Sequence, residues 1–330
     1  MQILELESQK PILEKLYSEI RDAAMTQSRV NHTVIVGHRG VGKTTVLREL
    51  TYRILGDTAL NEHFRVINPP FLFNGSQMDA ELERIIANAD ISSVKKHHLL
   101  LIDDLHLLLG DAEGVAHLLR KVLLRTEPTI SLIATADLGF REQLLRDSAL
   151  YGFLRILEMR GLDDSDVRRL LTDVVQGDSW KTLNTQLALT NPFWLDSITG
   201  SNARLLIVLK NVLCAAGNKS MSPDDLLKSY FEFVGPFFLN ELMEIPRNNR
   251  YFLEAASLLG RSFYLKEIDA DLVNPSQEAS RLQQRGFLDR QEKGTYSFHF
   301  PPLKAWLRYA KNLPLGLVLN VDIDVARAVR

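Results

Sequence analysis

The stretch TVIVGHRGVGKTTVL, Thr33 to Leu47, decides the fold because a glycine-rich turn joins a β-prone apolar run to a helical pattern. Gly37, four further residues and then Gly42, Lys43 and Thr44 give the spacing G-x-x-x-x-G-K-[ST]. Such a turn can point several backbone N–H groups at one polyphosphate, and the following helix adds its positive N-terminal end. The sequence therefore predicts a phosphate-binding loop between a strand and a helix.

ATP and Mg²⁺ are the cofactors that this loop predicts. Lys43 can reach the β- and γ-phosphates, and the Thr44 hydroxyl can ligate the metal. We expect the side chains of His38 and Arg39 to face outward. The residues predicted to bind the nucleotide are Gly37, His38, Arg39, Gly40, Val41, Gly42, Lys43, Thr44 and Thr45.

A second apolar run, LLLIDD (99–104), ends in two carboxylates. Asp103 has the position of an aspartate that holds the metal through water. Asp104 follows where many P-loop ATPases place a glutamate that polarises the attacking water. Because aspartate is one methylene shorter, we expect slow or partner-gated hydrolysis, the alternative being a merely solvated carboxylate. Thr135, at the end of SLIATAD (131–137), lies near the γ-phosphate if its strand neighbours that of Asp103.

Length and composition predict a multi-domain globular protein. The 330 residues exceed one ordinary core, and the formal net charge of −2 argues against a chain coated in basic charge. The single cysteine, Cys214, excludes a disulfide framework and a cysteine-based zinc site, and we expect it to be buried. The first residues lack a secretory apolar region, and no segment is long enough to span a membrane. A cytoplasmic protein without a membrane partner is expected.

The order of patterns predicts an α/β fold: a P-loop NTPase core with a parallel five-stranded sheet, a helical lid and a C-terminal winged-helix domain. The expected boundaries are 1–161 for the core, 162–238 for the lid, and 239–330 for the winged helix and tail. Four aromatic residues are expected in the core of the lid: Trp180, Phe193, Trp194 and Tyr230. The five strands are expected in HTVIVG (32–37), FRVINP (64–69), HHLLLIDD (97–104), TISLIATAD (129–137) and FLRILEM (153–159).

This order of parts resembles the P-loop ATPases of the AAA+/STAND superclass, and is similar in layout to origin-initiator and archaeal-type ATPases with a C-terminal winged helix. The resemblance implies that Arg204, in TGSNARLLIVLKNVL (199–213), is a sensor-2 arginine of the lid. It also implies an arginine finger that reaches a neighbouring subunit. Arg146 is the favoured finger, with Arg141 and Arg155 as alternatives; these arginines are otherwise helix-surface charges. The other segments that carry the resemblance to these ATPases are GHRGVGKTT (37–45), LLLIDD (99–104), IATAD (133–137) and ALYGFLRILEMRGLDDSDVRRLL (149–171).

The C-terminal part predicts three short helices, RNNRYFLEAASLLG (247–260), YLKEIDADL (264–272) and NPSQEASRLQQRG (274–286), followed by a hairpin. In winged helices that bind DNA, the third helix enters the major groove. Residues 247–312 contain eleven lysines and arginines against seven acidic residues, a net charge of +4 that leaves −6 for the rest. The side chains predicted to contact DNA are Arg281, Gln284, Arg285 and, at the hairpin tip, Lys293.

The expected function is an ATP-binding and hydrolysing switch that oligomerises with nucleotide and engages DNA or a DNA-associated partner. The alternative is a STAND-type signalling or defence ATPase whose winged helix docks a protein and not DNA. A small-molecule kinase is the weakest reading, because the sequence shows no acceptor site.

Overall fold

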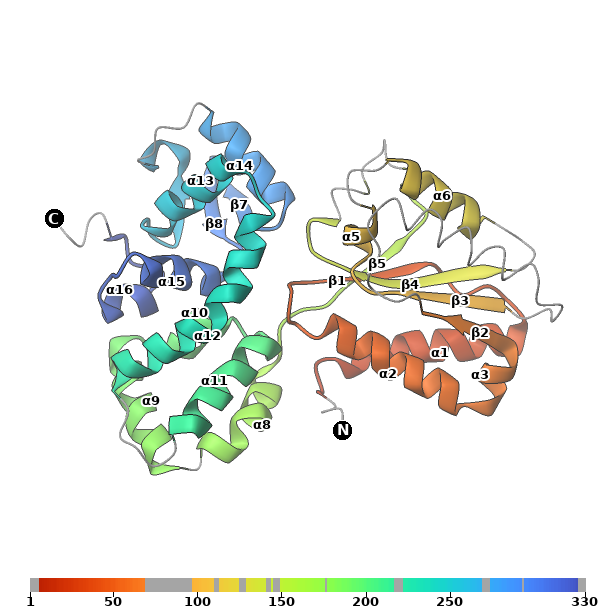
Figure 1. Cartoon of the computed structure of the whole chain (residues 1–330), viewed down its shortest axis with the longest axis horizontal. Helices are drawn as coiled ribbons and strands as arrows, with labels where there is room; N and C mark the ends of the chain where they lie inside the picture. The colour runs from red at the N-terminus through yellow and green to blue at the C-terminus, as the bar shows by residue number, and fades with distance from the viewer. Residues whose placement is uncertain are drawn as a thin grey trace. The chain divides into compact units, whose positions relative to one another are not determined.

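A computed structural model describes residues 6–68, 97–109, 113–124, 129–140, 144, 149–175, 177–216, 222–268, 274–292 and 294–325. The chain divides into two compact units, Met1–Arg160 and Gly161–Arg330, and each is described by itself (Figure 1). The expected separation of the second unit into a lid and a winged-helix domain stays a prediction. No helix in the described ranges is both long enough and apolar enough to cross a membrane.

The first unit is built on a five-stranded parallel sheet, and all five predicted strands are confirmed. The strand order is β2-β3-β4-β1-β5. Parallel strands end at the same edge of a sheet, so the polar residues that follow β1, β3 and β4 gather there. The strands are β1 (Thr33–Val36), β2 (Phe64–Ile67), β3 (His97–Ile102), β4 (Ile130–Ala136) and β5 (Arg155–Glu158).

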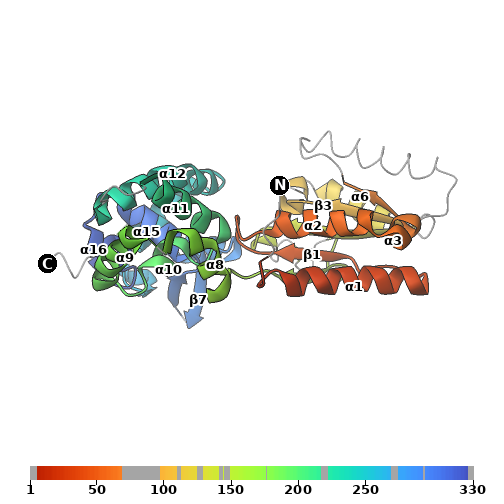
Figure 2. The ribbon, with the colours of Figure 1, turned by 90° about the horizontal axis from the view of Figure 1, so that it is seen from below.

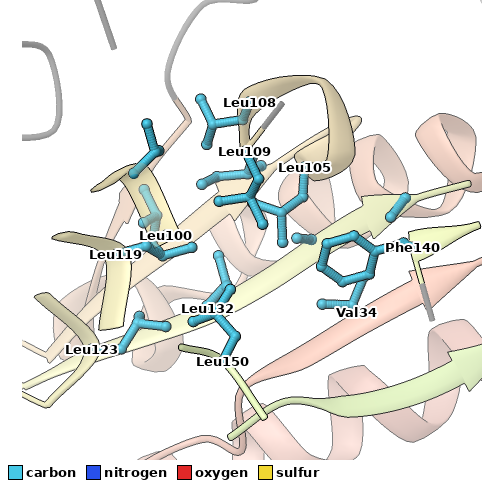
Figure 3. Close-up of a cluster of buried hydrophobic side chains, with 14 of the residues drawn as sticks. Val34, Leu100, Leu105, Leu108, Leu109, Leu119, Leu123, Leu132, Phe140 and Leu150 are labelled. Carbon is cyan, nitrogen blue, oxygen red and sulfur yellow. The ribbon is translucent and has the colours of Figure 1, made fainter. Parts of the chain in front are cut away.

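Helices cover both faces of this sheet (Figures 1 and 2). One face carries α1 (Lys10–Thr26), α2 (Lys43–Gly56) and α3 (Thr58–His63); the other carries α5 (Leu105–Leu109) and α6 (Glu113–Leu123). Successive strand residues point to opposite faces, so both sides of each strand must be apolar. Val34, Leu100 and Leu132 therefore pack with α5 and α6, as Figure 3 shows, while Ile35, Leu99 and Ile133 join the core under α1 and α2.

The second unit begins with a group of helices whose core contains three of the four predicted aromatics. Trp180, Trp194 and Tyr230 are buried, but Phe193 is 74% exposed, so that prediction is wrong. Phe193 is the N-cap residue of α10, one position before the buried residues begin. Cys214 is also exposed, contrary to expectation, because it falls outside the buried stripe of α11. The helices are α8 (Asp164–Val175), α9 (Asp178–Thr190), α10 (Trp194–Thr199), α11 (Ala203–Ala216) and α12 (Pro223–Met243).

The rest of the second unit contains a small antiparallel sheet of order β6-β8-β7. The expected helix in 264–272 is wrong over its described part, which is the end of β6 and one 3-10 turn, η1. Helix α15 lies within residues 247–312, and α16 lies in the C-terminal tail, to which the sequence assigned no role. Whether these elements are a winged helix stays a prediction. They are α13 (Arg247–Ser257), β6 (Ser262–Tyr264), η1 (Leu265–Glu267), α14 (Pro275–Gln284), β7 (Leu288–Glu292), β8 (Thr295–Phe298), α15 (Pro301–Ala310) and α16 (Leu315–Leu319).

Candidate functional site: the carboxyl edge of the parallel sheet

The loop between β1 and α2 requires glycine at three positions. Gly40 and Gly42 have φ angles of +80° and +113°, a region that side chains strongly disfavour. A Cβ atom on Gly37 would lie 2.6 Å from the Met159 carbonyl oxygen, and one on Gly42 would lie 2.2 Å from Gln9 Nε2. The glycines therefore let the loop curl tightly between its neighbours.

Lys43 begins α2 and is only 7% exposed. Its Nζ donates to the carbonyl oxygens of Gly37 (2.7 Å) and His38 (2.9 Å), which belong to the same loop. Carbonyl dipoles thus stabilise the buried ammonium group inside the curl. Thr44 and Thr45 follow in the first turn of α2, where unsatisfied N–H groups and the helix dipole favour an anion.

Asp103 and Asp104 follow β3 directly, and both are held by Thr135 of the neighbouring strand β4. The Thr135 hydroxyl donates to Asp103 Oδ1 and accepts from the backbone N–H of Asp104 at 2.8 Å. The expectation that the strands of Asp103 and Thr135 are neighbours is confirmed, since β3 pairs with β4. One buried hydroxyl therefore fixes the carboxylate of Asp103 and the backbone that presents Asp104.

Asp104 has an unusual backbone and an unusual pKa. Its φ angle is +48°, a left-handed conformation that aspartate adopts more readily than most residues. Burial raises the pKa of Asp104, and the negative charge of Asp103 raises it further, whereas His106, Lys43 and Arg39 lower it. Because Lys43 and Arg39 belong to the glycine-rich loop, the two motifs share one electrostatic environment.

The oxygen donors of this edge suit Mg²⁺. The carboxylate of Asp103 is 8% exposed, and its charge acts on the pKa of Asp104, so a buried anion is present that a divalent cation would neutralise. The hydroxyl of Thr44 can supply a hard oxygen ligand directly, and Asp103 would hold the metal through water. No cluster of three or more His, Cys, Asp or Glu side chains suited to a metal is found in the described ranges, so a metal here would take its remaining ligands from phosphate and water.

The predicted arginines have different surroundings. Arg155 donates to both oxygens of Glu19, at 2.7 and 2.6 Å, and to the Thr33 hydroxyl at 2.9 Å, so it is held within its own unit. Arg204 belongs to the second unit, where its guanidinium lies 5.4 Å from the ring centroid of Phe237. Arg141 and Arg146 lie outside the described residues.

Three of the four predicted DNA contacts share one face of α14 and its end. Arg281, Gln284 and Arg285 are exposed and spaced at i, i+3 and i+4. Arg285 Nη1 donates to the Glu244 carbonyl at 2.7 Å, and Arg281 Nη1 lies 3.5 Å from Glu278. Lys293 lies outside the described residues.

Sequence reasoning missed Gln9, Lys304 and Arg308. Gln9 contacts the glycine-rich loop from a position 32 residues away along the chain, and no local motif marks it. Lys304 and Arg308 counted as basic charge of the C-terminal region, but both are buried. Their spacing of four on one helix was the available signal, because such residues share a face.

Comparison with known proteins agrees with this geometry. Residues 33–151 match the family model described as "ATPase family associated with various cellular activities (AAA)". The chaperone protein ClpB of Rickettsia prowazekii is 32% identical over 146 residues, which cover 40% of this chain and 17% of that protein. The chain thus spans less than a fifth of that relative.

Solved structures show the same fold. The Aeropyrum pernix ORC2 protein, in ADPNP-ADP complexes, has a TM-score of 0.54 at 15% identity, covering 99% of this chain and 95% of that one. Cdc6p from Pyrobaculum aerophilum has a TM-score of 0.51 at 16% identity, covering 94% and 96%. The predicted α/β P-loop fold is confirmed, and residues 33–151 are similar to the AAA ATPase family.

Proposed function

We propose that this protein is a nucleotide-dependent switch that binds Mg-ATP at residues 37–45 and hydrolyses it slowly. The observation that carries the proposal is the convergence of the glycine-rich loop and the Asp103–Thr135 pair at one sheet edge, where Lys43 acts on the pKa of Asp104. The AAA ATPase match over these residues supports it.

In this proposal each residue has a separate task. Lys43 exchanges its carbonyl partners for the β- and γ-phosphates, and the N-terminus of α2 adds further donors. Thr44 and Asp103 would hold Mg²⁺, which would supply positive charge at the transferred phosphate. Asp104 accepts the proton of the attacking water, a role for which a raised pKa is useful. Thr135 keeps both aspartates in place.

Self-association is the next part of the proposal. The resemblance to AAA+ ATPases implies that Arg146 reaches the nucleotide of a neighbouring subunit and that Arg204 senses it from the lid. Nucleotide would then favour an oligomer, because each site is completed by two chains. Size-exclusion chromatography with ATP, ADP and no nucleotide tests this; equal elution in the three states would contradict it.

We further propose that the exposed face of α14 engages DNA through Arg281, Gln284 and Arg285. Arginine and glutamine suit phosphates and base edges, and all three side chains are exposed. Lys304 and Arg308 are buried, so the basic excess at the surface is smaller than the net charge of residues 247–312 suggests. That reduction favours the alternative, a STAND-type ATPase that docks a protein there.

Two experiments test the proposed function. Calorimetry with Mg-ATP should show binding to the full chain, and absence of heat would refute the nucleotide switch. A mobility shift with duplex DNA should show binding that weakens in Arg281→Ala, with a smaller dependence on salt, while Arg261→Ala on an exposed position serves as the control. Nucleotide binding without any duplex affinity would leave the protein-docking alternative.

A further inference from the structure

Gln9 contacts the glycine-rich loop although it is far from it in sequence. The side chain is 7% exposed, and its Nε2 donates to the Val41 carbonyl oxygen at 3.1 Å. Gln9 is the N-cap residue of α1, yet its side chain makes no capping hydrogen bond to that helix. Its amide therefore contacts the loop, and it does not cap the first turn of α1 as an N-cap side chain commonly does.

The contact restrains one peptide plane of the loop. The Val41 carbonyl and the Gly42 N–H belong to the same planar peptide and point in opposite directions. A donor that holds the carbonyl on one side therefore holds the N–H toward the other side. Gly42 needs this restraint, because a glycine at φ +113° and ψ 12° has many alternative conformations open to it.

The absence of a side chain at Gly42 is what admits the Gln9 amide. A Cβ atom built on Gly42 would lie 2.2 Å from Gln9 Nε2 and 3.3 Å from Met159 Cε. The space beside Gly42 is thus filled by Gln9 and Met159. Gln9 supplies the polar contact that orients the peptide, and Met159 supplies apolar packing.

We propose that Gln9 is a positioning residue for nucleotide binding, which keeps the Gly42 N–H directed into the loop where the phosphates of a nucleotide bind. The proposal rests on the proposed function, since it assumes that the loop holds a nucleotide. Gln9 itself acts through the Val41–Gly42 peptide.

Gln9→Met is the first test, because methionine keeps the length and unbranched shape of glutamine and removes the donor. Calorimetry with Mg-ATP on the full chain should show affinity about three- to tenfold weaker, the usual effect of one hydrogen bond. The stoichiometry should remain that of the wild type, which shows that the variant is folded. Lys10→Met, at the next position in an exposed ion pair with Glu7, is the matched control and should bind as the wild type does.

Gln9→Glu separates orientation of the peptide from packing. An ionised carboxylate cannot donate to the Val41 carbonyl, but a protonated one can. The affinity of this variant, as a ratio to the wild type at the same pH, should therefore recover as the pH falls from about 7 to about 4, through the ordinary glutamate pKa of about 4.3. A merely structural defect would not recover with protonation.

The outcomes are distinct. No binding by the wild type refutes the nucleotide switch and this inference together. Binding by the wild type with unchanged affinity in Gln9→Met overturns the inference alone, as does a Gln9→Glu ratio that does not vary with pH.

Discussion

Lys43 in the first unit and Arg308 in the second are both buried cations that hydrogen-bond to backbone carbonyls. They differ in where along the chain those carbonyls lie. Lys43 donates to two carbonyls of the loop to which it is joined. Arg308 is 0% exposed and uses all five guanidinium N–H donors on carbonyls from two separate segments. These acceptors are Ser257, Leu259, Leu317, Asn320 and Ile323.

The difference shows how a buried charge serves either chemistry or architecture. The partners of Lys43 lie within six residues of it, so they can be exchanged for phosphate without separating elements of the fold. The partners of Arg308 join the end of α13 to the segment after α15, so losing them separates those elements. Lys304, one turn before Arg308, supports the same junction by donating to the Gly260 carbonyl at 2.6 Å.

The largest expected effect is the loss of this junction in Arg308→Met. The free energy of unfolding of the second unit should fall by at least about 3 kcal/mol, because each buried acceptor left without a donor costs about 1–3 kcal/mol. Urea denaturation followed by tryptophan fluorescence measures it, since Trp180, Trp194 and Trp306 all belong to this unit. The exposed Arg261→Met is the control, and equal midpoints for the two variants would contradict the architectural role.

Lys43→Ala should weaken nucleotide binding and leave the stability of the second unit unchanged. We expect Mg-ATP affinity to fall by about 100-fold or more, near 2.7 kcal/mol, because the ammonium that meets the β- and γ-phosphates is lost. Tryptophan-detected unfolding of the second unit should not change. Calorimetry measures the Mg-ATP affinity, and the same urea titration measures the stability of the second unit. Retained affinity would show that the lysine is only structural.

Asp104→Asn should reduce turnover and leave binding intact. We expect ATP hydrolysis to slow by about tenfold to 100-fold as the proton acceptor is removed, measured by phosphate release. Comparable loss of Mg-ATP affinity would contradict the role assigned to Asp104.

The same variant should also stabilise the first unit at neutral pH. The pKa of Asp104 is higher in the folded chain than in the unfolded one, so the ionised carboxylate opposes folding above that raised pKa. This penalty disappears as the pH falls below the unfolded value of about 3.9. The gain in thermal stability from Asp104→Asn should therefore vanish at about pH 4.

The last prediction concerns how the stability of the second unit changes with pH. Burial, with the charge of Arg308, lowers the pKa of Lys304 to about 7. The unfolded chain keeps this lysine protonated up to about pH 10.4, so between about 7 and 10 the unfolded state binds more protons and stability rises with pH. Lys304→Met should flatten this rise of stability with pH, measured by tryptophan-detected unfolding. An unchanged slope would show that a group other than Lys304 causes the rise.

The sequence predicted the first unit well because its signals are local. The strand, glycine-rich turn and helix around Gly37–Lys43 lie within fifteen residues, and the apolar run before Asp103 identifies a second strand in the same way. Strand existence and the polar residues at strand ends follow from composition along a few consecutive positions. The prediction that Thr135 lies near the γ-phosphate depends on its strand being next to that of Asp103. The pairing of β3 with β4 meets this condition.

Long-range contacts decided the rest. Counting charges in 247–312 could not show that Lys304 and Arg308 are buried, because their partners lie up to 51 residues away. Periodicity likewise could not separate exposed Phe193 from buried Trp194, since Phe193 precedes the helix and adjacent helix positions point about 100° apart.

The sequence by itself determined which residues can hold a polyphosphate, since that chemistry depends on glycines and a lysine at fixed spacing. Only the tertiary structure decided how those residues are held. The contacts of Gln9 with Val41 and of Thr135 with Asp103 and Asp104 each join segments about thirty residues apart. The physical reason is that a hydrogen bond requires proximity in space, and chain folding, not spacing along the chain, creates that proximity.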